Sequence, residues 1–211
     1  MDKENLAVDY LEKEHIENIA EEIHSEKNIK DFPFEVELFL YERFKYRVFP
    51  SPRLEAGCKI DTALVACKQI LRIDETIYNK QPKRANFSIA HEVGHLILHK
   101  NIIAMMVEAL KSAEKTDDYA SIINFLPRNQ YRRAEWQADY FGGALLAPRR
   151  ILEKELIKLI EERKSKYISE EEIDDEDRDI IYHDLAKLFD ITKPAITVRI
   201  SVADLDYLLY T

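Results

Sequence analysis

The spacing of apolar residues along the chain predicts a mostly helical protein with a few short strands. From about Leu6 to Ile23 the apolar side chains recur at helical intervals, which is typical of an amphipathic helix. A second helix is expected after Pro33, because proline suits the first turn of a helix. Further stretches with helical spacing lie at about 87–100, 101–115, 132–146 and 149–166, and the tail from residue 182 is expected to form helix, turn, helix.

Strands are expected between residues 46 and 77. The segment "YRVFPS" is rich in β-branched and aromatic residues, and "TALVACKQILRIDETI" should contain one or two further strands. In "QILRID", Leu71 and Ile73 alternate with Arg72 and Asp74, which fits a half-exposed strand. The following "NKQPKR" is expected to be a turn, and "TDDYASIINFLPRNQ" a loop or a broken helix.

Composition places this chain among folded globular proteins. It has 211 residues, of which 46% are hydrophobic, and this is enough to build one large domain or a domain with a small addition. We expect a domain over residues 1–148 and a helical C-terminal region over 149–211 that packs on it. No apolar run is long enough to span a membrane, and the acidic N-terminus lacks the pattern of a signal peptide. Cys58 and Cys67 are expected to be free thiols, so a cytoplasmic protein without a membrane partner is predicted.

Net charge argues against nucleic acid as a direct partner. The formal charge is −9, and a surface of that sign repels phosphate as a whole. The densest basic clusters, "PRNQYRRAEW" and "LAPRRI", are short and are expected to be solvated surface.

The motif "HEVGH" carries the clearest chemistry in the sequence. On a helix, His91 and His95 lie one turn apart on the same face, so that both rings can bind one zinc ion. Glu92 is rotated by about 100° and is poorly placed as a ligand. It is instead expected to act as the general base for water in metal-assisted hydrolysis. Gly94 costs about 1 kcal/mol relative to alanine in a helix, which suggests the close approach of another backbone or of a substrate.

His99 lies one turn beyond His95 and is expected to stay outside the ligand set. A three-histidine motif of the H-E-x-x-H-x-x-G-x-x-H type needs glycine and histidine where this chain has Leu98 and Asn101. His99 is therefore expected either to bond to a ligand or to cap the helix near its C-terminus.

A third metal ligand is expected in "RRAEWQADYFGGALLAP". Glu135 can reach the metal from this helix, and Asp139, one turn later, can accept a hydrogen bond from a ligating histidine. A solvated helix face beside Arg132 and Arg133 is the alternative for both residues. Other candidate ligands, in poorer context, are Glu108 and His183. Gly142 and Gly143 are expected to let this helix pack closely on the region of Gly94.

The segments "RANFSIAHEVGHLILH" and "EWQADYFGGALLAP", in that order, resemble the ImmA/IrrE family of metallopeptidases. The resemblance is strongest over about Tyr46 to Pro148 and implies an α+β, zincin-like fold in which helices flank a small mixed sheet. It implies His91, His95 and Glu135 as metal ligands and Glu92 as catalytic acid and base. The sequence departs from the family pattern at Phe141-Gly142-Gly143, where family members often have "FAA".

The function implied is a zinc-dependent endopeptidase, with manganese as the alternative metal. The expected substrate is a protein, in particular a transcriptional repressor, because members of that family cleave repressors of phage, mobile-element or stress regulons. An edge strand near "QILRID" is expected to hold the substrate. Candidates for stabilising the oxyanion are Tyr131, Tyr140, Tyr182 and His183.

Two other functions remain open. The protein could bind and sequester a repressor or an antitoxin without cleaving it. It could also be a metal hydrolase that acts on a bond other than a peptide bond.

Overall fold

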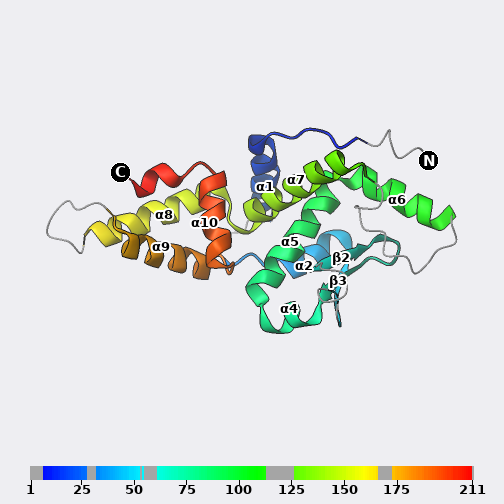
Figure 1. Ribbon diagram of the computed structural model, residues 1–211, viewed down its shortest axis with the longest axis horizontal. Helices are drawn as coiled ribbons and strands as arrows, with labels where there is room; N and C mark the ends of the chain where they lie inside the picture. The colour runs from blue at the N-terminus through cyan, green and yellow to red at the C-terminus, as the bar shows by residue number, and fades with distance from the viewer. Residues whose placement is uncertain are drawn as a thin grey trace. The chain divides into compact units, whose positions relative to one another are not determined.

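The structure is a computed structural model that describes residues 7–27, 32–52, 54, 61–112, 126–165 and 173–210 (Figure 1). The chain divides into two compact units. The first unit comprises Met1–Ile16 and Glu35–Gly142, and the second comprises Glu17–Phe34 and Gly143–Thr211. The domain boundary expected after residue 148 stays a prediction.

A three-stranded mixed sheet lies in the first unit. Its strands are β1 (Arg47–Ser51), β2 (Thr62–Val65) and β3 (Ile70–Asp74), in the order β1-β3-β2. β1 runs parallel to β3, and β2 runs antiparallel to it with Thr62 opposite Ile73. The α+β fold with a small mixed sheet is therefore confirmed. Most of "QILRID" forms β3, which is hydrogen-bonded on both sides, and β2 is an edge strand beside it.

The helices of the first unit surround the sheet and the histidine motif. They are α2 (Val36–Phe44), α4 (Glu75–Lys80), α5 (Pro82–Leu98), α6 (Lys100–Ser112) and most of α7 (Arg128–Leu146), with a short 3-10 turn, η2, at Ala66–Lys68. The predicted turn "NKQPKR" is confined to Gln81, which ends α4 and precedes α5, and the residues on either side of it are helical. Asp74 caps α4 by accepting hydrogen bonds from the backbone of Thr76 and Ile77, and Pro82 then opens α5.

The second unit is helical. It contains α8 (Arg149–Lys164), α9 (Asp175–Leu188), α10 (Lys193–Val202), the 3-10 turn η4 (Asp206–Leu209) and most of α1 (Lys13–Glu26). The tail forms the expected helix, turn, helix, with side-chain caps from Asp174 on α9 and Thr192 on α10. α1 begins at Lys13 rather than near Leu6, and residues 7–12 are not helical. Among the described residues, no helix is both long enough and apolar enough to cross a membrane.

Arg199 is a core residue of the second unit. Its side chain is 2% exposed, and its two terminal nitrogens lie 2.7 and 2.8 Å from the carboxylate oxygens of Glu17. Its Nε donates to the backbone carbonyl of Ala147 at 3.0 Å. This bidentate pair satisfies a guanidinium that is hidden from solvent.

Two glycines set the contact between α5 and α7. A Cβ atom at Gly94 would lie 3.0 Å from the Cα of Ala138, and one at Gly142 would lie 3.1 Å from the backbone nitrogen of His91. Both are backbone contacts, so no side-chain movement could relieve them. The expected close packing of Gly142 near the motif helix is thus confirmed, whereas Gly143 faces the Arg199 side chain instead.

We expect the substitution Gly94→Ala to destabilise the protein although alanine favours helices. The crowding against Ala138 should cost about 1–3 kcal/mol, more than the gain of about 1 kcal/mol in helix propensity. The measurement is the urea midpoint of unfolding, compared with that of the wild type. A stabilised Gly94→Ala variant would show that the two helices are not packed this closely.

His24 makes the stability of the second unit depend on pH. Its Nε2 donates to the carbonyl of Leu145 at 2.7 Å, and its Nδ1 is buried without a hydrogen-bond partner among the described residues. The ring lies against Phe32 and Phe34. Burial lowers the pKa of His24 below its usual 6.5, and this effect outweighs the bond to Leu145 and the charge of Glu21.

The unfolded chain should therefore bind a proton more readily than the folded protein. The free energy of unfolding is not reduced by His24 above pH 6.5. It should fall as the pH drops from there through the folded-state pKa of His24. Denaturant unfolding between about pH 7.5 and pH 5 measures this, and His24→Gln, which keeps a donor but cannot titrate, is the control. Parallel curves for the two proteins would exclude His24 as the cause.

Candidate metal centre

α5 brings His91 and His95 together at the spacing that the sequence predicts. Their Nε2 atoms lie 3.0 Å apart, and the His95 side chain is only 3% exposed. α5 is buried on most of its surface, since it packs on β2 and α2 and crosses α7 at Gly94. The two ring nitrogens therefore meet where little water can reach His95.

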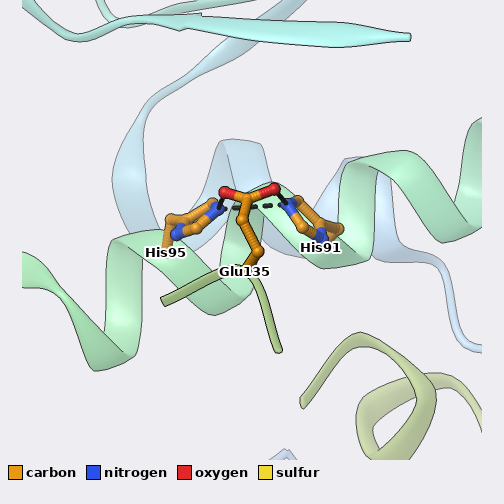
Figure 2. A group of neighbouring side chains, drawn as sticks. All are labelled: His91, His95 and Glu135. Atoms are coloured by element: carbon orange, nitrogen blue, oxygen red, sulfur yellow. Dashed lines mark hydrogen bonds and ion pairs between the residues drawn. The ribbon is translucent and has the colours of Figure 1, made fainter. Parts of the chain in front are cut away.

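Glu135 joins the two histidines from α7. Figure 2 shows its carboxylate between the two rings, with one oxygen 3.2 Å from the Nε2 of His95 and the other 3.7 Å from the Nε2 of His91. Among the described residues, these three form the one group of histidine, cysteine or acidic side chains whose ligand atoms converge, all within 4.8 Å of one another. A tetrahedral ion with ligands at about 2.0–2.1 Å has ligand atoms about 3.3 Å apart, so the spacing fits a metal.

Asp139 holds the ring of His91. Its Oδ1 lies 2.7 Å from the Nδ1 of His91 and accepts a hydrogen bond from it. A neutral histidine with a proton on Nδ1 carries its lone pair on Nε2, which is the atom that faces Glu135. The structure thus brings Asp139 to the position expected for a residue that orients a ligand.

The charges at this site favour a cation. Burial by itself would lower the pKa of His91, but the hydrogen bond to Asp139 and the charges of Glu92, Asp139 and Glu135 raise it to about 9. Burial would likewise raise the pKa of Glu135, but its hydrogen bond to His95 and the two histidine charges lower it. Three acidic groups thus stabilise the positive charge of protonated His91. A divalent ion bound between the rings can replace the proton that carries this charge. The donor set of two imidazoles and one carboxylate fits a metal of the zinc type.

Glu92 lies beside the ligand group without joining it, as its position in the motif predicts. It is 8% exposed, and its Oε1 accepts a hydrogen bond of 2.7 Å from the hydroxyl of Thr62 on β2. Nothing in the sequence pattern singles out Thr62, because it lies 30 residues before Glu92 on a different element.

Tyr131 is the oxyanion candidate that the structure places beside the ligands. Its hydroxyl is hydrogen-bonded to Glu135, and burial together with the charge of Glu135 raises its pKa, so the phenol keeps its proton. Tyr140 is buried and packs on Trp136. Tyr182 and His183 belong to the second unit.

His99 and Gln137 extend the site beyond its ligands. The Nδ1 of His99 lies 3.0 Å from the Nδ1 of His95, and its Nε2 lies 2.8 Å from the amide oxygen of Gln137. Burial lowers the pKa of His99 to about 4, so this ring is neutral. His99 is thus bonded to a candidate ligand, which was one of its two expected roles. Gln137 was missed, because it faces away from Glu135 on the same helix.

Other predicted site residues are not brought together. Among the described residues, Glu108 on α6 and His183 in the second unit are absent from the converging group. His183 is exposed and lies beside Asp184. Cys58 and the side chain of Cys67 lie outside the described part of the structure, as does most of the segment between α6 and α7.

Fold and site together define a class: an α+β protein with an HExxH motif on one helix and a glutamate from a later helix beside it. The chain belongs to the Peptidase_M78 family, the IrrE N-terminal-like domain, whose model matches residues 59–201. The family resemblance is thereby confirmed. Membership supports a metallopeptidase-type function, and the His91, His95 and Glu135 group supports a metal cofactor.

A solved structure with a similar fold is a Mycobacterium tuberculosis transcriptional regulator. The TM-score is 0.57 at 15% sequence identity, and the match covers 88% of this chain and 55% of that chain. This chain therefore spans little more than half of the regulator, and the likeness concerns the fold alone. No curated protein matches the sequence.

We expect Glu135→Ala to lose most of the bound metal. The substitution removes one of three ligands, so metal content by mass spectrometry after dialysis should fall from about one ion per chain to well below that. Glu108→Ala is the matched control, since it removes a carboxylate outside the converging group. Unchanged metal content in Glu135→Ala would refute the ligand assignment.

Proposed function

We propose that this protein is a zinc-dependent endopeptidase that cleaves a transcriptional repressor or a similar regulatory protein in the cytoplasm. The observation that carries the proposal is the convergence of His91, His95 and Glu135 next to a buried Glu92. Family membership supports a peptidase, and the imidazole and carboxylate donors favour zinc, with manganese as the alternative.

When bound, the metal would polarise the scissile carbonyl and lower the pKa of water. Glu92 supplies the proton transfers. Because its Oε1 accepts a hydrogen bond from Thr62, its Oε2 is the oxygen left to take a proton from the attacking water. A C–O bond then forms at the peptide carbon. Glu92 returns the proton to the peptide nitrogen as the C–N bond breaks, so an acid and an amine leave.

Tyr131 is the donor proposed for the oxyanion. Its phenol stays protonated beside Glu135, so the hydroxyl can turn from the carboxylate to the developing negative charge on the carbonyl oxygen. Tyr131→Phe should therefore lower kcat more than it changes KM.

β2 is the strand proposed to hold the substrate. Among the described residues it is hydrogen-bonded only to β3, and its first residue, Thr62, touches Glu92. An extended peptide that paired with the other edge of β2 would pass beside the catalytic carboxylate.

The choice of a repressor as substrate rests on the family resemblance. An acidic surface with no long basic cluster supports a protein partner over nucleic acid. The experiment that identifies the substrate is co-expression with candidate transcription factors, followed by mass spectrometry of the fragments.

Glu92→Gln should abolish cleavage and leave metal binding intact. The amide has the same shape but cannot take a proton, so the rate should fall by about 100-fold to 10,000-fold. The assay is cleavage of the co-expressed factor, with metal content measured in parallel. If Glu92→Gln relieved repression in cells as well as the wild type does, the protein would act by sequestration rather than by proteolysis.

Thr62 offers a finer test of the same carboxylate. Thr62→Val should lower kcat by about 10-fold with little change in KM, because Glu92 loses the hydrogen bond that orients it. Thr62→Ser, which restores the hydroxyl, should recover most of the activity. Equal kcat values for Thr62→Val and the wild type would show that Glu92 needs no such support.

A further inference from the structure

A buried chain of hydrogen bonds leads from the metal centre to the N-terminal segment. The Nδ1 atoms of His95 and His99 lie 3.0 Å apart, and the Nε2 of His99 lies 2.8 Å from the Oε1 of Gln137. The Nε2 of Gln137 donates to the backbone carbonyl of Asp9 at 2.8 Å. The two histidines are 3% exposed and Gln137 is 0% exposed, so water cannot replace these partners.

The carbonyl of Asp9 fixes the donor and the acceptor in every hydrogen bond between His95 and Asp9. A carbonyl can only accept, so the amide nitrogen of Gln137 must face Asp9, and its oxygen must face His99. His99 therefore carries its proton on Nε2 and presents an unprotonated Nδ1 to His95. His95 must then carry a proton on Nδ1, so that the neutral ring has its lone pair on Nε2, the atom that faces Glu135 and His91.

The carbonyl that sets this direction is itself held in place. Residues 7–12 are not helical, and they lie along α7 through side chains spaced at i, i+3 and i+7. The side chain of Gln130 accepts a hydrogen bond of 2.8 Å from the backbone nitrogen of Val8, and Arg133 donates one of 2.8 Å to the carbonyl of Val8. Gln137 donates to the carbonyl of the next residue, Asp9, and the side chain of Val8 is buried. The segment is thus fastened immediately before the carbonyl of Asp9.

We propose that His99 and Gln137 are positioning residues that lock His95 in the tautomer able to bind metal, with the Asp9 carbonyl as the fixed end of the relay. This inference rests on the proposed metal centre. The two histidine ligands are then supported differently. His91 is held by the carboxylate of Asp139, whose side chain is 60% exposed, whereas His95 is held by a neutral, buried relay that ends on the backbone.

The proposal is tested by zinc affinity, measured by competition with a chromophoric chelator. His99→Leu removes the acceptor for His95 and should weaken zinc binding by about 10-fold to 100-fold, the usual effect of losing such a partner. His99→Gln should recover most of that loss, because its amide can accept from His95 and donate to Gln137. Gln137→Leu should weaken binding by about 10-fold.

Gln130→Leu is the matched control. Gln130 lies on the same helix and holds the same segment through Val8, but it is not part of the relay between His95 and Asp9. The zinc affinity of Gln130→Leu should stay within about twofold of the wild type, because Arg133 still holds the segment through the carbonyl of Val8. Urea unfolding of the metal-free variants gives their free energies of unfolding. If the hydrogen bonds only stabilised the fold, the loss of zinc affinity would follow the loss of this free energy.

A second readout does not depend on metal. Nitrogen-15 NMR of the imidazoles in the zinc-free wild-type protein should show His99 with its proton on Nε2 and His95 with its proton on Nδ1. Should wild-type protein bind no zinc, the proposed function would fail, and this spectrum would still decide the relay.

Three results would overturn the proposal. They are a His95 ring with its proton on Nε2 alone, unchanged zinc affinity in His99→Leu, or an equal loss of affinity in Gln130→Leu and Gln137→Leu.

Discussion

The backbone contact between α5 and α7 is the constraint on which the candidate metal centre depends. Gly94 lies against Ala138, and Gly142 lies against the backbone of His91. One helix carries both histidines and Glu92, and the other carries the glutamate. Because the two backbones are in contact, the packing of the helices sets the distance between Glu135 and the two histidine rings. A larger residue at either glycine would move the carboxylate away from the histidines.

Each candidate side chain at this centre has a polar side chain beside it that can orient it. Asp139 supports His91, Thr62 supports Glu92, Tyr131 supports Glu135, and His99 supports His95. The partners come from α7, from β2 and from the residue that follows the C-terminus of α5, so the helix crossing and the sheet act together. A site organised in this way is set before a metal or substrate arrives, which is the arrangement that lowers the reorganisation needed for catalysis.

The parts of the site that follow helical spacing could be predicted from the sequence. The pairing of His91 with His95 and the placing of Glu135 with Asp139 need only the period of a helix and the chemistry of a missing ligand. Thr62 and the carbonyl of Asp9 could not be predicted, because each reaches the site from an element distant in sequence. The fold shows the same division. The strands were found from their residues, but which strand lies at the edge depends on pairing, and β3 proved to be the central one.

Anomalous diffraction at the zinc edge, from crystals of the protein grown with zinc, tests the central claim most directly. One strong peak is predicted between α5 and α7, at about 2.0–2.1 Å from the Nε2 atoms of His91 and His95 and from a carboxylate oxygen of Glu135. Glu92 should lie outside the bonding distance of the ion. A peak elsewhere, or an ion bound through Glu92 or through the Nδ1 of either histidine, would contradict this account.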